Sequence, residues 1–458
     1  MKRDFFKNLS SQISTNILSR LPLRTIAISK CVCKPWLHLL ATDDFVKSHL
    51  AKSDPCLALS TADEDSTSFA VFELNDDQNL NRHDLHYNRL TKFDFPHSSN
   101  IICSANGFLF LQGSGETHYV CNPITREHTE LHCSQEIIQP CRKIVNYPEI
   151  LGESRYAYPD FVGYGFGVSK ISDQYKVVRI YLDSVIVQGN NGSFSGRRVI
   201  PKAECHVHTL GTGQWRRVEP GALLLEYTYR SSCVFLNGNL HWVASDCDEK
   251  LWISCFDLET ESFNYLSIPP IFQESFELMP GLSTLEECLC LCDQTMEEET
   301  VIWVMKEYGV EESWTKEYTI RLNDGDEIYV EGWELVYPIK VFEDGDILML
   351  LENTQLLYYS GKNETVGQVG IFGIASGSIL FTPSFLSLTS LGVESVVHTS
   401  TTRTHVEEVK ELEESMGNQE MAVLNYEKAS PTPSSSVRKR RSCRGPSTET
   451  LCRDSSGK

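Results

Sequence analysis

Three cysteines at alternate positions are the first candidates for chemistry in this sequence. Cys288, Cys290 and Cys292 stand two residues apart in the run ECLCLCD. Side chains two apart on a β-strand share one face, so the three thiols could in principle contribute to a metal site. The spacing differs from that of a zinc knuckle, and no matching pair of histidines or cysteines follows. A free cysteine also serves as a small buried hydrophobe, and the sequence favours that interpretation, with no metal site.

Two histidines form a second candidate. His206 and His208 would share one face of a strand and could supply two metal ligands. A lone His-x-His in a strand is more often a packing or surface feature, so we expect no metal here either. Residues 163–167, GYGFG, are rich in glycine, but strand residues flank them and no helix with a lysine follows. They predict a strand rather than a phosphate-binding loop.

Catalytic patterns are otherwise missing from the sequence. It contains no Ser-His-Asp order, no nucleophile elbow and no His-Glu metal signature. We therefore expect a protein with no catalytic residues of its own and no cofactor.

The overall charge restricts the classes of partner. There are 41 Lys+Arg against 62 Asp+Glu, a formal net charge of −21 at pH 7. An acidic chain is poorly suited to binding the phosphate backbone, so we expect no nucleic-acid partner. No apolar run approaches the roughly 18 residues that span a bilayer, and the N-terminus lacks a signal-peptide core, so we expect no membrane partner. The chain is predicted to be intracellular, with its 16 cysteines as reduced thiols.

The elements that must position these residues begin with a helical region. Ile13, Ile17 and Leu21 recur every four residues, and Ser10 or Ser11 is a plausible N-cap for a short helix. Pro22 then breaks the chain. Apolar groups continue to residue 50, which predicts three or four short helices. Helices this short cannot bury all of their apolar surface alone, so they need a partner.

These helices carry a resemblance. Residues 17–37, ILSRLPLRTIAISKCVCKPWL, followed by residues 44–50, DFVKSHL, resemble an F-box. Two positions depart from the family pattern. Leu9-Ser10 stands where members begin Leu-Pro, and Pro35 stands where they carry a serine or another polar residue. Ser10 can cap a helix, and Pro35 is tolerated if its helix begins there. The alternative is a free-standing helical hairpin that caps the next domain.

The resemblance implies docking onto a Skp-type adaptor and, through it, onto a cullin–RING ubiquitin ligase. The residues predicted to bind the adaptor are Leu9, Ile13, Ile17, Leu18, Leu21, Pro22, Leu23, Ile26, Cys31, Val32, Trp36 and Leu40.

From about residue 53 the pattern changes to short alternating strands with tight turns. Asn106-Gly107, Asn237-Gly238 and Asp344-Gly345 are hairpin signals. The stretch from Gly238 to Gly345 spans two repeats, which gives a period of about fifty residues. We expect a β-propeller of antiparallel four-stranded units, with five copies from residue 101 onward. Strands within 56–74 would form a further blade or complete the last one by pairing near 379–388. The alternative is an array of β-sandwiches. Residues 75–90 and 133–160 are predicted loops.

The β region carries a resemblance of its own. Residues 104–127, 162–180, 234–263 and 381–388 resemble the F-box-associated interaction domain of plant F-box proteins, which is related to kelch-type propellers. The resemblance implies a receptor for a target protein, but the sequence identifies neither the target nor the residues that bind it. The glycines expected to set the backbone geometry are Gly107, Gly165, Gly167 and Gly238. Packing between blades is the expected role of Trp215, Trp242, Trp252, Trp303 and Trp314.

The predicted fold is therefore mainly β with a small N-terminal helical domain. Residues 1–52 form the F-box, residues 53–390 form the propeller-like domain, and residues 391–458 form a polar, disordered tail. The tail contains a basic cluster, Arg438, Lys439, Arg440 and Arg441, which could direct nuclear import. The expected location is the cytoplasm, the nucleus or both.

The function that follows is substrate recognition in an SCF-type (Skp–cullin–F-box) ubiquitin ligase. Two alternatives stay open at this point. One is an F-box scaffold or regulator that acts outside a ligase, and the other is a propeller that binds a carbohydrate or small ligand.

Overall fold

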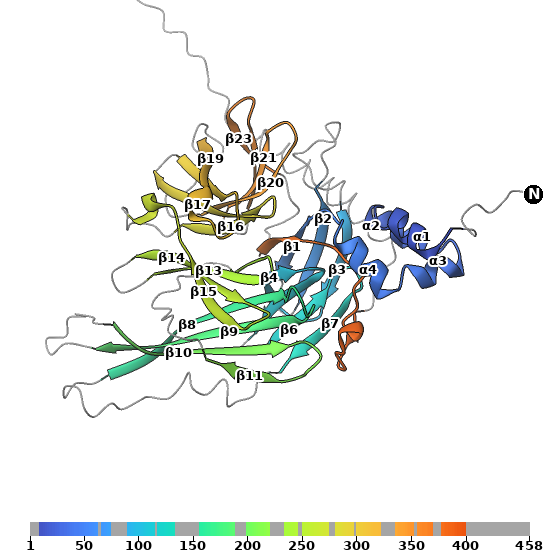
Figure 1. Ribbon diagram of the computed structural model, residues 1–458, viewed down its shortest axis with the longest axis horizontal. Helices are drawn as coiled ribbons and strands as arrows, with labels where there is room; N and C mark the ends of the chain where they lie inside the picture. Colours follow the sequence, from blue (N-terminus) through green and yellow to red (C-terminus); the bar gives the residue numbers. More distant parts are fainter. Residues whose placement is uncertain are drawn as a thin grey trace, which may run out of the picture. The chain divides into compact units, whose positions relative to one another are not determined.

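The structure is a computed structural model (Figure 1). The residues that it describes are 9–62, 66–74, 89–114, 117–132, 155–187, 198–219, 233–245, 250–273, 280–296, 299–321, 335–351, 355–369 and 377–399. The predicted tail beyond residue 399 and its basic cluster lie outside the described residues.

Four short helices open the described chain. They are α1 (Ser11–Leu18), α2 (Leu23–Ser29), α3 (Lys34–Leu39) and α4 (Asp43–Leu50). Ser10 caps α1, because its Oγ accepts a hydrogen bond from the backbone N–H of Ile13 at 3.3 Å. Helix α3 begins at Lys34, so Pro35 occupies the first turn, where a backbone N–H has no partner within the helix. Pro35 therefore fits its helix.

The rest of the described chain forms six sheets, each one blade of a propeller. Blade 1 contains β24 (Gly377–Phe381), β1 (Cys56–Ala62), β2 (Thr67–Glu73) and β3 (Arg89–Phe95). Blade 2 contains β4 (Ser99–Ala105), β5 (Phe108–Gly113), β6 (His118–Asn122), β7 (Glu127–Leu131) and β25 (Val397–His398). Blade 3 contains β8 (Arg155–Val168), β9 (Tyr175–Val187), β10 (Arg198–Thr209) and β11 (Trp215–Val218).

The remaining three blades follow the same plan. Blade 4 contains β12 (Val234–Leu236), β13 (Asn239–Ser245), β14 (Leu251–Asp257) and β15 (Ser262–Leu266). Blade 5 contains β16 (Gly281–Leu285), β17 (Cys288–Met296), β18 (Glu299–Met305) and β19 (Trp314–Arg321). Blade 6 contains β20 (Val336–Val341), β21 (Ile347–Leu351), β22 (Gln355–Ser360) and β23 (Thr365–Gln368). The described residues also include the 3₁₀ turns η4 (Pro270–Gln273), η5 (Glu311–Ser313) and η6 (Thr389–Leu391).

Blade 1 closes the ring with strands from both ends of the propeller sequence. β1 pairs antiparallel with β24, so that Cys56 lies opposite Phe381 and Ser60 lies opposite Gly377. The early strands β1, β2 and β3 therefore form a further blade, which the C-terminal strand β24 completes. Blades 2 to 6 are the five copies predicted downstream, which confirms the propeller over the sandwich array.

Close packing between neighbouring blades explains several sequence features. A Cβ at Gly167 would lie 2.5 Å from the Phe235 ring, so only glycine lets blade 3 approach blade 4 this closely. Asn106 and Gly107 both have positive φ, as a two-residue hairpin turn requires. All five predicted packing tryptophans lie in or against the apolar cores of the propeller, which confirms that role.

Two predicted loops contain strand residues. β3 begins at Arg89, inside the predicted loop 75–90, and its outward face is polar because it is the outer strand of its blade. β8 begins at Arg155, inside the predicted loop 133–160. Pro159 made this segment look like a loop in the sequence, because proline is unusual inside a strand. The pairing of β8 with β9 shifts register between Pro159 and Phe161, which accommodates the proline. Residues 75–88 and 133–154 lie outside the described residues.

The chain continues past the last blade as an ordered segment, residues 382–399, which we call the strap. In Figure 1 it runs, in orange, from β24 to the outer edge of blade 2. There β25 pairs with β7, with Val397 opposite His128. The strap therefore extends beyond residue 390, where the predicted domain boundary was placed. Within the described residues, no helix is long and apolar enough to cross a membrane.

Candidate functional site

Four of the predicted adaptor-binding residues form the interior of the helical domain. Leu18, Leu23, Ile26 and Leu40 are at most 6% exposed, and all but Leu23 pack around Phe45 in one cluster. Their side chains stabilise the arrangement of the helices and present nothing to an outside partner. Their predicted role as direct contacts stays a prediction, and their burial gives them a supporting role. Three further predicted residues, Leu9, Leu21 and Trp36, are half-buried.

A different set of apolar side chains faces outward. Ile13 (50% exposed), Ile17 (46%) and Val32 (62%) were predicted to bind the adaptor, and Pro22 and Cys31 are exposed as well. Sequence reasoning missed Ile28 (64%) and Leu37 (45%). Both sides of these helices are apolar, so periodicity alone does not reveal which side faces solvent. We call Ile13, Ile17, Ile28, Val32 and Leu37 the exposed apolar face.

The opposite side of the helical domain contacts the propeller. Val46 of α4 joins the apolar core shared by blades 2, 3 and 4. Lys47 Nζ lies 2.6 Å from Asp173 Oδ2 in the β8–β9 turn, and this hydrogen bond to Asp173 raises the pKa of Lys47. Arg24 Nη2 donates to the carbonyl oxygen of Arg89, at the start of β3, at 3.0 Å. These contacts place the helices at one end of the propeller, which we call the helical end.

The strap inserts one side chain into the helical domain. Phe385 packs against the cluster formed by Leu18, Ile26, Leu40 and Phe45. Lys30 Nζ stands 3.7 Å from the centre of the Phe385 ring, a cation–π distance. Burial at this contact lowers the pKa of Lys30.

The same strap is anchored to blade 2 by two buried polar side chains. Asn122 Nδ2 donates to the carbonyl oxygens of Ser384 (3.0 Å) and Leu386 (2.7 Å). Glu127 accepts from Leu388 N–H at 2.7 Å and from Ser387 Oγ at 2.8 Å. Asn122 and Glu127 belong to the sequence CNPITRE, and their partners belong to the sequence SFLSL. Both stretches lie in the ranges that resemble the F-box-associated domain, and the structure shows that they bind each other.

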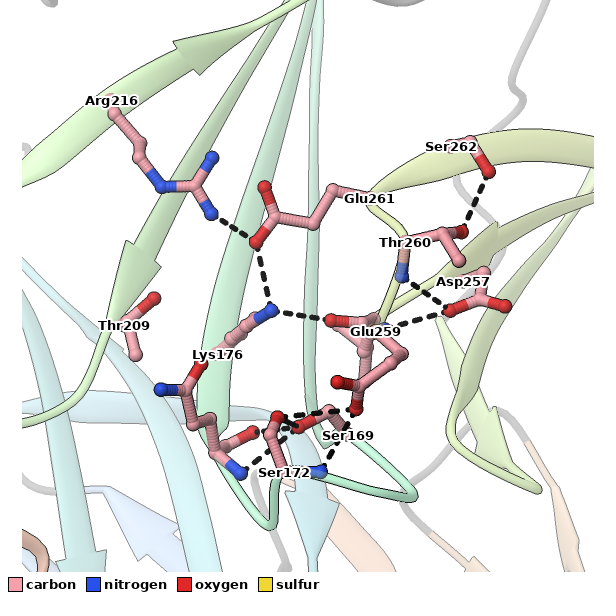
Figure 2. Close-up of polar contacts among 12 residues, drawn as sticks. Ser169, Ser172, Lys176, Thr209, Arg216, Asp257, Glu259, Thr260, Glu261 and Ser262 are labelled. Atoms are coloured by element: carbon pink, nitrogen blue, oxygen red, sulfur yellow. Dashed lines mark hydrogen bonds and ion pairs between the residues drawn. The ribbon is translucent and has the colours of Figure 1, made fainter.

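A polar network joins blade 3 to blade 4 at the same end (Figure 2). Glu259 Oε2 accepts hydrogen bonds from the backbone N–H groups of Ile171 and Ser172 and from Ser172 Oγ, which fixes the β8–β9 turn. This is the turn that Lys47 contacts through Asp173.

A buried ion pair completes this network. Lys176 Nζ lies 2.8 Å from Glu261 Oε1, and the two side chains are only 4% and 14% exposed. Lys176 also donates to the Leu258 carbonyl, and Arg216 pairs with Glu261 from the other side. Burial works to raise the pKa of Glu261, but the hydrogen bonds from Arg216 and Lys176 leave it lowered overall. The arrangement is a structural joint between blades.

The central channel opens beside α4. A cavity of about 1160 Å³ is lined by the first strands of the blades and by α4 residues such as Asp43 and Lys47. Glu286 and Glu287, both at positive φ, form the β16–β17 turn at this opening. A small-ligand site, the sequence-based alternative for this protein, would lie in this channel.

The candidate metal ligands lie in packed surroundings. Cys290 and Cys292 are fully buried among aliphatic side chains between blades 5 and 6, as expected for small hydrophobes. Burial lowers the pKa of His208 to about 4, and its ring lies 5.3 Å from that of Trp215. Among the residues that the structure describes, no three His, Cys, Asp or Glu side chains are placed to hold a metal ion together.

Comparison with known proteins agrees with this architecture. The model of the F-box associated beta propeller domain matches residues 59–384. F-box protein CPR1 of Arabidopsis thaliana is 27% identical over 379 residues, which cover 78% of this chain and 83% of that protein. F-box protein At3g07870 of the same plant is 27% identical over 387 residues, covering 78% and 86%. F-box/kelch-repeat protein At3g23880, also from that plant, is 24% identical over 318 residues, covering 68% and 78%. Since the family match alone spans most of the chain, the protein belongs to the plant F-box proteins that carry an F-box-associated β-propeller domain.

Proposed function

We propose that this chain is the substrate-recognition subunit of an SCF-type ubiquitin ligase. The F-box binds a Skp-type adaptor, the adaptor binds a cullin–RING scaffold, and the propeller holds a target protein. The chain supplies no catalytic step of its own. Its contribution is proximity, because a bound target reacts with the conjugating enzyme at a high effective concentration.

The observation that carries the proposal is the exposed apolar face. Five large aliphatic side chains, 45% to 64% exposed, gather on the first three helices and the turn that follows α2. A soluble monomer rarely leaves so much apolar surface uncovered on a unit of this size. Their neighbours Leu18 and Ile26 are already buried inside the helical domain, so the exposed set is available for a partner. An adaptor with a complementary apolar groove would cover it.

The target would bind at the end of the propeller opposite the F-box. The helical end is occupied by α4, whose Val46 and Lys47 contact the propeller, and by the strap. η4 lies at the opposite end, because it follows the last strand of blade 4, and its Ile271 is 48% exposed. This geometry keeps the target and the adaptor from competing for the same surface.

The test is a calorimetric titration of the full chain with a purified Skp-type adaptor. An Ile17→Asp/Val32→Asp variant places two charges in the exposed apolar face without disturbing the helical core, and we expect at least about a hundredfold loss of affinity. Ile271→Asp introduces a charge at an equally exposed isoleucine on the propeller and is expected to bind normally. Absence of binding by the folded, unmutated chain would refute adaptor docking.

A second titration separates the ligase from the scaffold alternative. The complex of adaptor and chain is mixed with a purified cullin–RING scaffold. Formation of the larger assembly on a sizing column supports the ligase. An adaptor complex that excludes the cullin would favour the regulator or scaffold instead.

We further propose an intracellular location, in the cytoplasm, the nucleus or both. The motivation is the basic cluster Arg438, Lys439, Arg440 and Arg441, which lies outside the described residues. Replacing the four residues by alanine in a fluorescent fusion is expected to lower the nuclear fraction. An unchanged distribution would remove the cluster's role in import.

A further inference from the structure

The strap contacts both the F-box and the propeller. Phe385 packs against both the F-box cluster and the apolar core of blades 2 to 4, and Leu386 and Leu388 are buried in that core. The Phe385 ring touches both clusters, so one short stretch of chain contacts the F-box and the propeller together. The strap is therefore the third component of the junction between the F-box and the propeller.

Hydrogen bonds from blade 2 hold the strap in its position. Asn122 and Glu127 hold Ser384, Leu386, Ser387 and Leu388 through four hydrogen bonds, and all four bonds involve partners buried or half-buried in blade 2. A Cβ at Gly211 would overlap the carbonyl oxygen of Leu391, so blade 3 also fits closely against the strap.

The position also depends on closure of the ring. β24 ends at Phe381, which lies opposite Cys56 in β1. Only three residues separate Phe381 from Phe385, a reach of about 14 Å for a fully extended chain. Pairing of β24 in blade 1 therefore holds Phe385 within reach of the F-box. The F-box itself is attached just before β1, so both partners are brought together by the same pairing.

The remaining contacts between F-box and propeller are modest. The Lys47–Asp173 pair joins side chains that are 57% and 59% exposed, and such exposed ion pairs contribute little to stability. Arg24 adds one exposed hydrogen bond to the carbonyl oxygen of Arg89, and Val46 adds an apolar contact with the core of blades 2 to 4. Phe385, enclosed by the F-box cluster and by Lys30, is the principal apolar contact that the strap makes with the F-box.

We propose that the strap couples closure of the propeller to the seating of the F-box, so that the F-box is held in one orientation only on a closed ring. The coupling goes beyond adaptor docking and target binding. It determines the position from which a bound target faces the rest of a ligase.

The test is hydrogen–deuterium exchange on the full chain without any adaptor, so its result does not depend on the proposed function. Glu127→Ala removes both anchors of Ser387 and Leu388, and these hydrogen bonds of Glu127 go to the strap rather than to the F-box. We expect at least about tenfold faster exchange in peptides that contain the Leu388 amide, and also in peptides of α4, because four short helices are marginally stable once undocked.

Two further variants make the test specific. Phe385→Ala is expected to accelerate exchange in α4 while the Leu388 amide stays protected by Glu127. Glu299→Ala removes an ion pair with Arg321 at the other end of blade 5 and is expected to change neither region. If Glu127→Ala fails to fold, Ser387→Ala takes its place in the test: it removes the hydrogen bond to the same carboxylate, together with two local hydrogen bonds to Thr389.

Two outcomes would overturn the proposal. Faster exchange at Leu388 with unchanged exchange in α4 would show that the F-box does not depend on the strap. Unchanged exchange at both places would show that Glu127 does not anchor the strap.

Discussion

Glu127 Oε2 accepts a hydrogen bond from the backbone N–H of Leu388 at 2.7 Å, across 261 residues of sequence. The carboxylate begins β7 in blade 2, and the amide belongs to the strap that leaves blade 1. The contact links the closing strand of the ring to a neighbouring blade and, through Phe385, to the F-box.

Asn122→Ala is expected to destabilise the propeller by about 2–4 kcal/mol, because it leaves two buried carbonyl oxygens without a donor and removes the acceptor for Ile124 N–H. Urea unfolding followed by tryptophan fluorescence measures the change. Asn264→Ala, at an exposed position of β15, is the matched control and should be nearly neutral. Equal stability of the two variants would remove Asn122 from the anchoring of the strap.

Gly167→Ala is expected to cost about 1–3 kcal/mol, because the added Cβ would lie 2.5 Å from the Phe235 ring and 2.6 Å from Leu258 Cδ1. Gly367→Ala offers a control with nothing within 4 Å of the new Cβ. Thermal unfolding of both variants is the measurement. A similar melting temperature for the two would mean that blades 3 and 4 are not packed as closely as described.

Glu261→Ala is expected to destabilise the protein by about 3–5 kcal/mol, because Lys176 then stays buried without its carboxylate partner. The double variant Lys176→Met/Glu261→Ala should recover part of this loss, since it removes the buried charge as well. Glu317→Ala breaks the more exposed pair with Lys306 and should cost no more than about 1 kcal/mol. Urea unfolding of the four proteins gives the comparison, and a double variant less stable than Glu261→Ala would argue against a buried ion pair.

Stability is expected to fall as the pH drops from about 6.5 to about 4. Burial lowers the pKa of His208 and of His241 to about 4, so in this range the unfolded chain binds protons that the folded protein excludes. Each histidine then lowers the free energy of unfolding by about 3 kcal/mol near pH 4, and it has no such effect above its ordinary pKa.

Melting temperatures measured from pH 8 to pH 4 test this expectation. His208→Gln should flatten the acid slope, because it removes one of the two buried rings. A wild-type stability that stays level down to pH 4 would contradict the buried, neutral state of these rings.

Much of the fold could be predicted from local chemistry. Asn106-Gly107 and Asn237-Gly238 specify tight turns by themselves, and the two repeats between Gly238 and Gly345 give the blade period. The starts of strands β3 and β8 were harder to predict from the sequence, because the outer face of β3 is polar and Pro159 interrupts the alternating pattern of β8.

The candidate site was predictable only in part. The F-box pattern located the helices, but their spacing did not distinguish the buried Leu18 from the exposed Ile17 beside it. Ile28 and Leu37 were missed because solvent exposure depends on how four helices pack together. The role of Glu127 depends on a contact with Leu388, and local sequence patterns do not reveal a contact between residues so far apart in the sequence.

The closure of blade 1 also sets an order of events during protein synthesis. Ser60 and Gly377 are joined by a hydrogen bond although 317 residues separate them. At about 5–20 residues per second, the ribosome needs roughly 15 to 60 s to make the intervening chain. During that interval the F-box and β1 have emerged while β24 does not yet exist, so β1 exposes a free sheet edge to chaperones and to other nascent chains. Translation that stops after blade 6 would release a chain with a complete adaptor-docking sequence and an open ring.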